Sequence, residues 1–148
     1  MTDIFCTEQI AVITFGGIPA ETENKFIMSV LEAACEYDIN IDMISKAYLS
    51  TDCSSIGFSI DDEAIPRFIK AIKPLNLTKP PMMSCGNVKI VIKSEDMITE
   101  RGFALSVFSV LSSLSTIPLL ITTAIDEISV IIRESEAEKA VQYLKNLF

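Results

Sequence analysis

The chain of 148 residues contains no histidine and no tryptophan, and its acidic residues outnumber its basic residues by 20 to 12. Histidine is the most common general base, so its absence excludes Ser-His-Asp and Cys-His catalytic arrangements. The net charge of −8 repels phosphate backbones, and the nearest basic grouping, Lys70, Lys73 and Lys79, is spread out. We therefore expect no catalytic residues and no nucleic-acid partner.

Cysteine is sparse, and its spacing does not match a metal site. Cys6, Cys35, Cys53 and Cys85 lie far apart, with no C-x-x-C pair. Without histidine, a zinc site would need all four thiolates or help from carboxylates. We expect free thiols in a reducing compartment, with no metal and no cofactor.

Long apolar runs are also missing, although 49% of the residues are hydrophobic. The nearest candidate, residues 103–123, is interrupted by several serines and by Pro118, whereas a membrane-spanning helix needs about 20 apolar residues. The first residues lack the basic region and apolar core of a secretion signal. We expect a soluble cytoplasmic protein that does not bind membranes.

The second half of the sequence repeats the first half. A constant shift of 77 positions aligns Ile13 with Ile90, Phe26 with Phe103, Val30 with Val107 and Ile44 with Ile121. The shift then falls to 72, where residues 56, 58 and 60 meet residues 128, 130 and 132. The sequence therefore predicts two copies of one structural unit.

Each copy has the same order of predicted elements. Short β-branched runs predict strands over residues 9–15, 39–45 and 55–60, and over residues 88–92, 117–123 and 127–133. Apolar residues at helical spacing predict helices over residues 22–37 and 99–115. A further helix begins at Asp61 or Asp62 in the first copy. In the second copy it begins at Ser135, where Ser-Glu-Ala-Glu matches a capping box.

A fourth strand is expected for each copy. The apolar segment near Met82 completes the first copy, and the matching segment near Phe5 completes the second from the other end of the chain. The resulting β-α-β-β-α-β order predicts an α+β fold of two ferredoxin-like units, each an antiparallel sheet with helices on one face. We expect the units to comprise residues 9–86, and residues 87–148 plus 1–8, and the shared strands to make them one cooperative module.

Several segments resemble the tandem ACT regulatory module of aspartokinases. They are Ile-Asn-Ile-Asp-Met-Ile-Ser at residues 39–45, Ser-Ile-Gly-Phe-Ser-Ile-Asp-Asp-Glu at residues 55–63, and Met-Ile-Thr-Glu-Arg-Gly-Phe-Ala-Leu-Ser-Val-Phe at residues 97–108. The resemblance covers most of the chain. It implies an amino-acid effector site between the first strand, the first helix and the second strand, often across a dimer interface.

The resemblance assigns candidate ligand contacts in both copies. They are Ile18, Pro19, Ala20, Phe26, Ile41 and Asp42 in the first copy, and Met97, Ile98 and Phe103 in the second. The ammonium group would bind Asp42, and backbone N–H groups at the helix start would bind the carboxylate. Phe26 and Phe103 also lie at core positions of their helices, and strand alternation alone would expose Asp42 to water.

The copies depart from the family pattern in different ways. In the second copy the acidic position falls on Leu119, and Glu100 stands where lysine-binding members carry a small hydroxyl residue. In the first copy Glu21 and Glu23 are expected near the carboxylate pocket. The first copy is therefore the better candidate site, and the second is expected to be structural.

The sequence thus predicts a non-catalytic regulatory module that senses an amino acid such as lysine or threonine. We expect it to form homodimers through its ACT units and to regulate an amino-acid biosynthetic enzyme, since the two copies leave no room for a kinase domain. The alternative is a purely structural dimerisation module with a decayed ligand site. An RNA binder with the same strand order is disfavoured by the acidic charge. An acylphosphatase-type enzyme is disfavoured because Arg101 and Arg133 have no phosphate loop around them.

Overall fold

The computed structural model describes all residues, 1–148, and divides into two compact units. One unit is the continuous segment Gln9–Cys85, and the other combines Met1–Glu8 with Gly86–Phe148. None of the helices is both long and apolar enough to cross a membrane.

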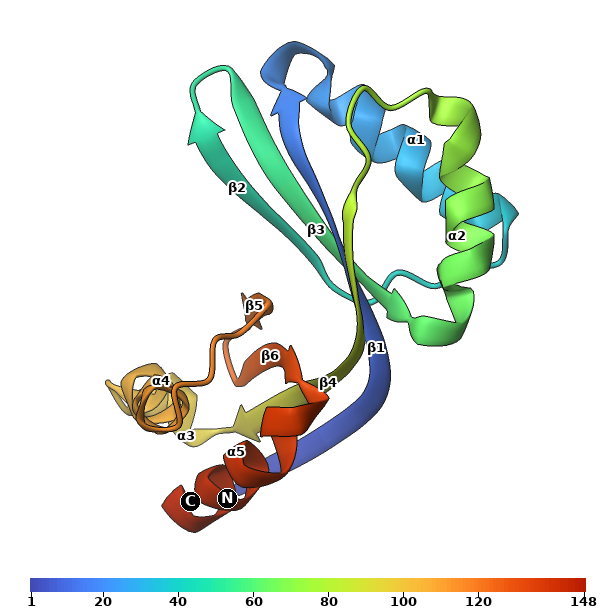
Figure 1. The fold of residues 1–148 in the computed structure, drawn as a ribbon. Helices are drawn as coiled ribbons and strands as arrows, with labels where there is room; N and C mark the ends of the chain where they lie inside the picture. The colour runs from blue at the N-terminus through green and yellow to red at the C-terminus, as the bar shows by residue number, and fades with distance from the viewer. The chain divides into compact units, whose positions relative to one another are not determined.

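The Gln9–Cys85 unit is a sheet with two helices on one face (Figure 1). Its elements are β1 (Thr2–Pro19, from residue 9), α1 (Glu23–Glu36), β2 (Ile44–Ser50), β3 (Cys53–Asp61), α2 (Ile65–Ile72) and the start of β4 (Met82–Ser94). The strand order is β2-β3-β1-β4, and β3 is antiparallel to both β1 and β2. In the pairing of β1 with β3, Ile13 lies opposite Phe58.

The core of this unit forms where alternate strand residues meet the apolar stripe of α1. Ile13, Ile56 and Phe58 are fully buried on the helix-covered face of the sheet. The Phe15 ring contacts the rings of Phe26 and Phe58 edge to face, with centroids 5.1 and 5.9 Å apart. Such aromatic pairs contribute about 0.5–1.5 kcal/mol beyond their buried area. They fix the end of β1 against the first turns of α1.

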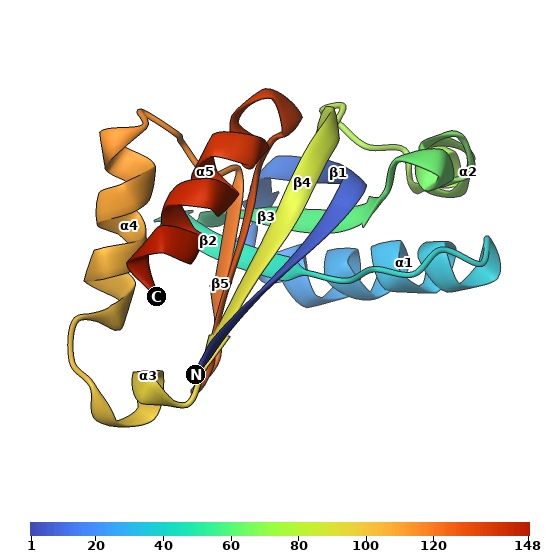
Figure 2. The ribbon, with the colours of Figure 1, turned by 90° about the horizontal axis from the view of Figure 1, so that it is seen from below.

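The other unit repeats this plan (Figure 2). Its elements are the first residues of β1, then β4, α3 (Asp96–Thr99), α4 (Phe103–Ser113), β5 (Leu120–Thr123), β6 (Glu127–Arg133) and α5 (Glu134–Leu147). The strand order is β1-β4-β6-β5, and β6 is antiparallel to β4 and β5. Ile4 packs against the core formed by Ile90, Val107, Val130 and Leu144. The predicted fold class is confirmed, including completion of the second unit by the N-terminal strand.

Two strands are longer than the sequence predicts. The apolar segments near Phe5 and Met82 are continuous with the strands that follow them, so β1 has 18 residues and β4 has 13. Each strand contains a residue with positive φ where one unit gives way to the other, Gln9 at 56° and Gly86 at 67°. These two positions are related by the same shift of 77.

Some predicted boundaries are wrong. The second-copy helix is divided, because Gly102 has a φ of 94° and separates α3 from α4. The capping box at Ser135 does not form: α5 begins at Glu134, and its N-cap Arg133 makes no side-chain cap hydrogen bond. Strand β2 begins at Ile44 rather than at residue 39, since residues 39–43 lead from α1 to the sheet.

Candidate functional site

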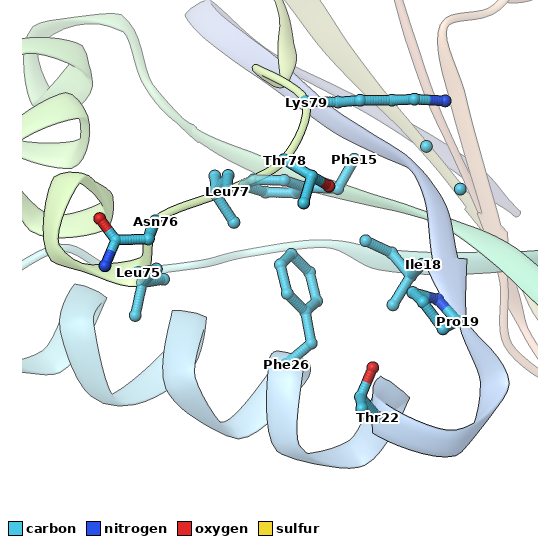
Figure 3. A pocket seen from close by; sticks show the side chains of 12 residues that line it. Phe15, Ile18, Pro19, Thr22, Phe26, Leu75, Asn76, Leu77, Thr78 and Lys79 are labelled. Atoms are coloured by element: carbon cyan, nitrogen blue, oxygen red, sulfur yellow. The ribbon is translucent and has the colours of Figure 1, made fainter.

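A cavity of about 260 Å³ lies in the Gln9–Cys85 unit where β1 ends and α1 begins (Figure 3). Two stretches of chain line it, one from β1 to the first turn of α1 and one from the segment after α2. The lining residues are Phe15, Gly16, Gly17, Ile18, Pro19, Thr22, Phe26, Leu75, Asn76, Leu77, Thr78 and Lys79. The cavity therefore belongs to one unit and needs no residue from the other.

The end of β1 leaves space because it contains a bulge made of two glycines. The pairing of β1 with β3 shifts register between Phe15 and Ile18, and Gly17 between them has a φ of 67°. An L side chain would be strained at that φ, whereas glycine is not. Gly16 has no other atom within 4 Å of where a Cβ would lie. The backbone of the bulge is thus open on this side.

Four polar side chains line the cavity, those of Thr22, Asn76, Thr78 and Lys79. Thr22 occupies the N-cap position of α1 but makes no capping hydrogen bond. Figure 3 shows the Thr22 and Thr78 hydroxyls directed into the space between Phe26 and Ile18. The Nζ atom of Lys79 lies 3.6 Å from the position that a Cβ atom would take on Gly17. No Asp or Glu lines the cavity.

The remaining walls are apolar. Phe26 projects from α1 between Ile18 on one side and Leu75 and Leu77 on the other (Figure 3). A shallower hollow continues along α1 past Lys25 and Ser29. The arrangement suits a small ligand with one apolar part and one polar or anionic end.

The structure brings together only part of the predicted first-copy site. Ile18, Pro19 and Phe26 line the cavity, and Ala20, directly after Pro19, lies in an exposed 3-10 turn, Ala20–Thr22. Ile41 packs against the hydrophobic core. Asp42 lies outside the cavity in the segment before β2, where its N–H donates to the Ser59 carbonyl at 3.0 Å.

The two glutamates expected at the carboxylate end lie elsewhere. Glu21 is exposed, and Glu23 is buried and forms a salt bridge with Lys46 of β2. The Lys46 ammonium also lies 4.5 Å from the centre of the Tyr48 ring. The hydrogen bond to Glu23 raises the pKa of Lys46, as does the charge of that carboxylate, while desolvation partly opposes them. Neither glutamate lines the cavity, so neither opposes an anion there.

The second-copy candidates lie in a different setting. Phe103 is buried and stacks on Phe148, with ring centroids 4.6 Å apart. Met97 packs against the core, whereas Ile98 is exposed. The shift of 77 places Lys93 and Ser94 where the first copy has its two glycines, and the Ser94 hydroxyl bonds with Thr2 and Asp96. The open backbone of the first copy is thus not repeated here.

Residues 75–79 were missed by the sequence-based prediction, which considered Lys79 only as part of a spread-out basic grouping. Asn76 carries a left-handed φ of 49° after the 3-10 turn Lys73–Leu75, and this conformation turns the chain. Asparagine after a helix is a known stop signal, so the turn was predictable. The segment 75–79 then lies across the cavity from Phe26, and this tertiary contact cannot be predicted from the local sequence.

The four cysteines are free, and no group of three or more His, Cys, Asp or Glu residues is arranged to hold a metal ion. Burial raises the pKa of the Cys6 thiol, a shift that Lys145 opposes and Glu8 reinforces. Burial likewise raises the pKa of Cys85, with a smaller contribution from Asp62. A raised pKa keeps a thiol protonated near neutral pH, which makes it a poor nucleophile.

These features define a protein of two ferredoxin-like units with a cavity of about 260 Å³ at the end of the first long strand. No protein-family model matches the chain. A curated relative, an aspartokinase from Geobacillus stearothermophilus, is 26% identical over 141 residues, which is 95% of this chain and 34% of that protein. This chain thus spans about a third of the length of that relative.

Solved structures share the fold across nearly the whole chain. The regulatory subunits of aspartate kinase from Thermus thermophilus, in ligand-free form, and from Thermus flavus have TM-scores of 0.85 and 0.86. Each is 20% identical, and the match covers 98% of this chain and 96% of the other. Aspartate kinase from Clostridium acetobutylicum matches with a TM-score of 0.82 and 18% identity, over 98% of this chain and 34% of that chain. The predicted resemblance to the aspartokinase regulatory module is confirmed.

Proposed function

We propose that this chain is a non-catalytic regulatory module built of two ACT units, which binds an amino-acid effector and controls an amino-acid biosynthetic enzyme of the aspartate kinase type. The observation that carries the proposal is the cavity at the junction of β1 and α1. The fold shared with proteins described as regulatory subunits of aspartate kinase supports the regulatory role. We place the module in the cytoplasm, with the enzyme it would control.

The cavity offers partners for two parts of an amino acid. The first turn of a helix has unpaired N–H groups, and those of α1 lie beside Thr22, whose hydroxyl caps none of them. A carboxylate placed there is favoured by the helix dipole. The side chain of the effector would contact Phe26 and the two leucines of the opposite wall.

The ammonium group has no acidic partner within the cavity, because Asp42 lies outside it. We propose that Asp42 of a second copy of the chain supplies this partner. The edge strand β2 exposes Ile44, Tyr48 and Leu49, and an exposed apolar edge favours association. We therefore propose a homodimer in which an effector binds between the Gln9–Cys85 units of two copies.

Isothermal titration calorimetry of the full chain against the individual amino acids, lysine and threonine included, tests the proposal. At least one amino acid is expected to bind, and Phe26→Ala is expected to weaken binding about tenfold by removing apolar contact. Phe108→Ala, a matched change on the equivalent helix of the other unit, should leave binding unchanged. Asp42→Asn should weaken binding without changing the fold.

A purely structural dimerisation module is the second candidate. The stacked Phe103 and Phe148 rings and the apolar Leu119 favour it for the unit that contains Gly86–Phe148. It predicts dimers by analytical ultracentrifugation whose association is unaffected by every amino acid. That result, together with an absence of heat on titration, would replace the regulatory proposal.

A further inference from the structure

We infer that the cavity of the Gln9–Cys85 unit recognises a small carboxylate with an apolar chain, that it does not require an ammonium group, and that Lys79 binds the carboxylate. A 2-oxo acid of five or six carbons belongs to this class. The inference rests on the proposed function only in using the same cavity as the effector site.

The cavity lining carries a single charge, which is positive. Lys79 is the only ionised side chain among the lining residues. It forms no salt bridge, so no carboxylate of the protein competes for it. A bound amino acid would bring a second ammonium near the exposed Lys79, and no acidic side chain of the same copy lines the cavity, so the two like charges would repel. A carboxylate without an ammonium group has no such repulsion.

The ammonium of Lys79 lies next to the glycine bulge of β1. Its Nζ atom lies over Gly17, where the bulge carries no side chain and the backbone is accessible. Figure 3 shows the Lys79 side chain extended, with its ammonium directed away from Leu75 and Leu77. An anion held between the ammonium and the open backbone would meet a charge-assisted hydrogen bond, the stronger kind.

The cavity is small, and its lining combines apolar side chains with two hydroxyls. A volume of about 260 Å³ lies just below the range of about 300–1,000 Å³ typical of ligand pockets, which suits a small ligand. Phe15, Ile18, Phe26 and the two leucines provide the apolar surface. The Thr22 and Thr78 hydroxyls make no hydrogen bond within the protein and can donate to an oxo or hydroxyl oxygen beside the carboxylate. Lysine, with two ammonium groups, fits this cavity worst.

The test compares 4-methyl-2-oxopentanoate with L-leucine, which has the same carbon skeleton, by isothermal titration calorimetry on the full chain. The oxo acid is expected to bind at least as tightly as leucine, and lysine is expected not to bind. Lys79→Met should weaken binding of the oxo acid roughly two- to fivefold, the range for loss of an ion pair at an exposed lysine. Lys79→Arg should retain most of the affinity, and Lys70→Met, a matched change on α2 outside the cavity, should leave it unchanged.

The outcomes separate this inference from the proposed function. Binding of leucine but not of the oxo acid overturns the inference and leaves the amino-acid effector in place. Binding of the oxo acid alone supports the inference and overturns the amino-acid part of the proposal. Binding of neither ligand overturns the inference, and if all other amino acids also fail it overturns the proposed function. Unchanged affinity in Lys79→Met removes Lys79 from the site.

Discussion

Two buried serines on β3 differ in what their hydroxyls contact. The Ser59 hydroxyl accepts a hydrogen bond from the Met43 N–H at 2.9 Å and thereby holds the segment that carries Asp42. The Ser54 hydroxyl is equally buried and has no hydrogen-bond partner. A buried polar group without a partner costs about 1–3 kcal/mol. Removing the hydroxyl at these two positions should therefore change the free energy of unfolding in opposite directions.

We predict that Ser54→Ala raises the free energy of unfolding by about 1 kcal/mol and that Ser59→Ala lowers it by about 1–3 kcal/mol. The first change removes an unsatisfied hydroxyl, whereas the second leaves the Met43 N–H without its acceptor. Urea unfolding followed by circular dichroism measures both. Equal and same-signed changes would show that the two hydroxyls have equivalent surroundings.

The salt bridge between Glu23 and Lys46 gives a prediction about pH. The hydrogen bond to Glu23 raises the pKa of Lys46 from its ordinary value of 10.5. A raised folded-state pKa contributes stability below the unfolded pKa, and this contribution is lost as pH rises through the folded pKa. Lys46→Met should therefore lower the thermal midpoint at neutral pH, and its difference from the wild type should shrink above pH 10.5.

Thermal midpoints of both proteins across the alkaline range check this expectation. Lys70→Met, which removes an exposed lysine outside the pair, serves as the control and should follow the wild type at every pH. A deficit in Lys46→Met that is constant with pH would contradict the assigned role of the ion pair.

At the scale of elements, the positive-φ residues of β1 and β4 have different conformational costs. Gln9 and Gly86 both adopt positive φ, which costs an L residue about 1–2 kcal/mol and costs glycine little. No neighbouring atom lies within 4 Å of where a Gly86 Cβ would be placed, so space does not limit substitution there. Backbone conformation alone distinguishes the two positions.

We predict that Gly86→Ala lowers the free energy of unfolding by about 1–2 kcal/mol and that Gln9→Gly raises it by up to about 1 kcal/mol. The exchange tests whether each bend is a fixed feature of the folded chain. Equilibrium denaturation of each variant measures the changes. Stabilisation by Gly86→Ala would show that the strand adopts negative φ there in solution.

Elements with strong local periodicity were predictable from the sequence. Strand β6 was predicted at its observed bounds, Glu127–Arg133, because alternating Ile and Val residues leave little choice of register. Helix α1 was predicted to within one residue at each end, since its apolar stripe faces the sheet. The predicted Ser135 capping box failed because its short motif competes with the extended backbone of Arg133 immediately before Glu134.

The cavity was predictable only in part. Ile18, Pro19 and Phe26 were found because they are local to the β1 to α1 connection. Lys79 was missed because its approach to Gly17 joins residues 62 positions apart, a contact that neither periodicity nor composition encodes. The salt-bridge partner of Glu23 was missed for the same reason, since helix α1 separates Glu23 from Lys46 in the sequence.

At the scale of the whole molecule, the internal shift of 77 explains why the chain crosses between its units twice. Residues 1–8 begin the first sequence copy but complete the unit that contains Gly86–Phe148. The start of β4 begins the second sequence copy but completes the Gln9–Cys85 unit. Neither unit can therefore be excised as a continuous copy of the repeat without losing a strand. This arrangement favours a single cooperative unfolding transition.

We predict that Ile4→Asp destabilises both units together, although Ile4 packs only against the core formed by Ile90, Val107, Val130 and Leu144. Placing a carboxylate there removes apolar contact and desolvates a charge, at a cost of about 2 kcal/mol or more. Phe5→Asp, at the exposed neighbouring position, should change stability by less than about 0.5 kcal/mol. Hydrogen exchange should show equal loss of protection in β3 and β6 for Ile4→Asp. A loss confined to β6 would mean that the shared strands do not couple the two units.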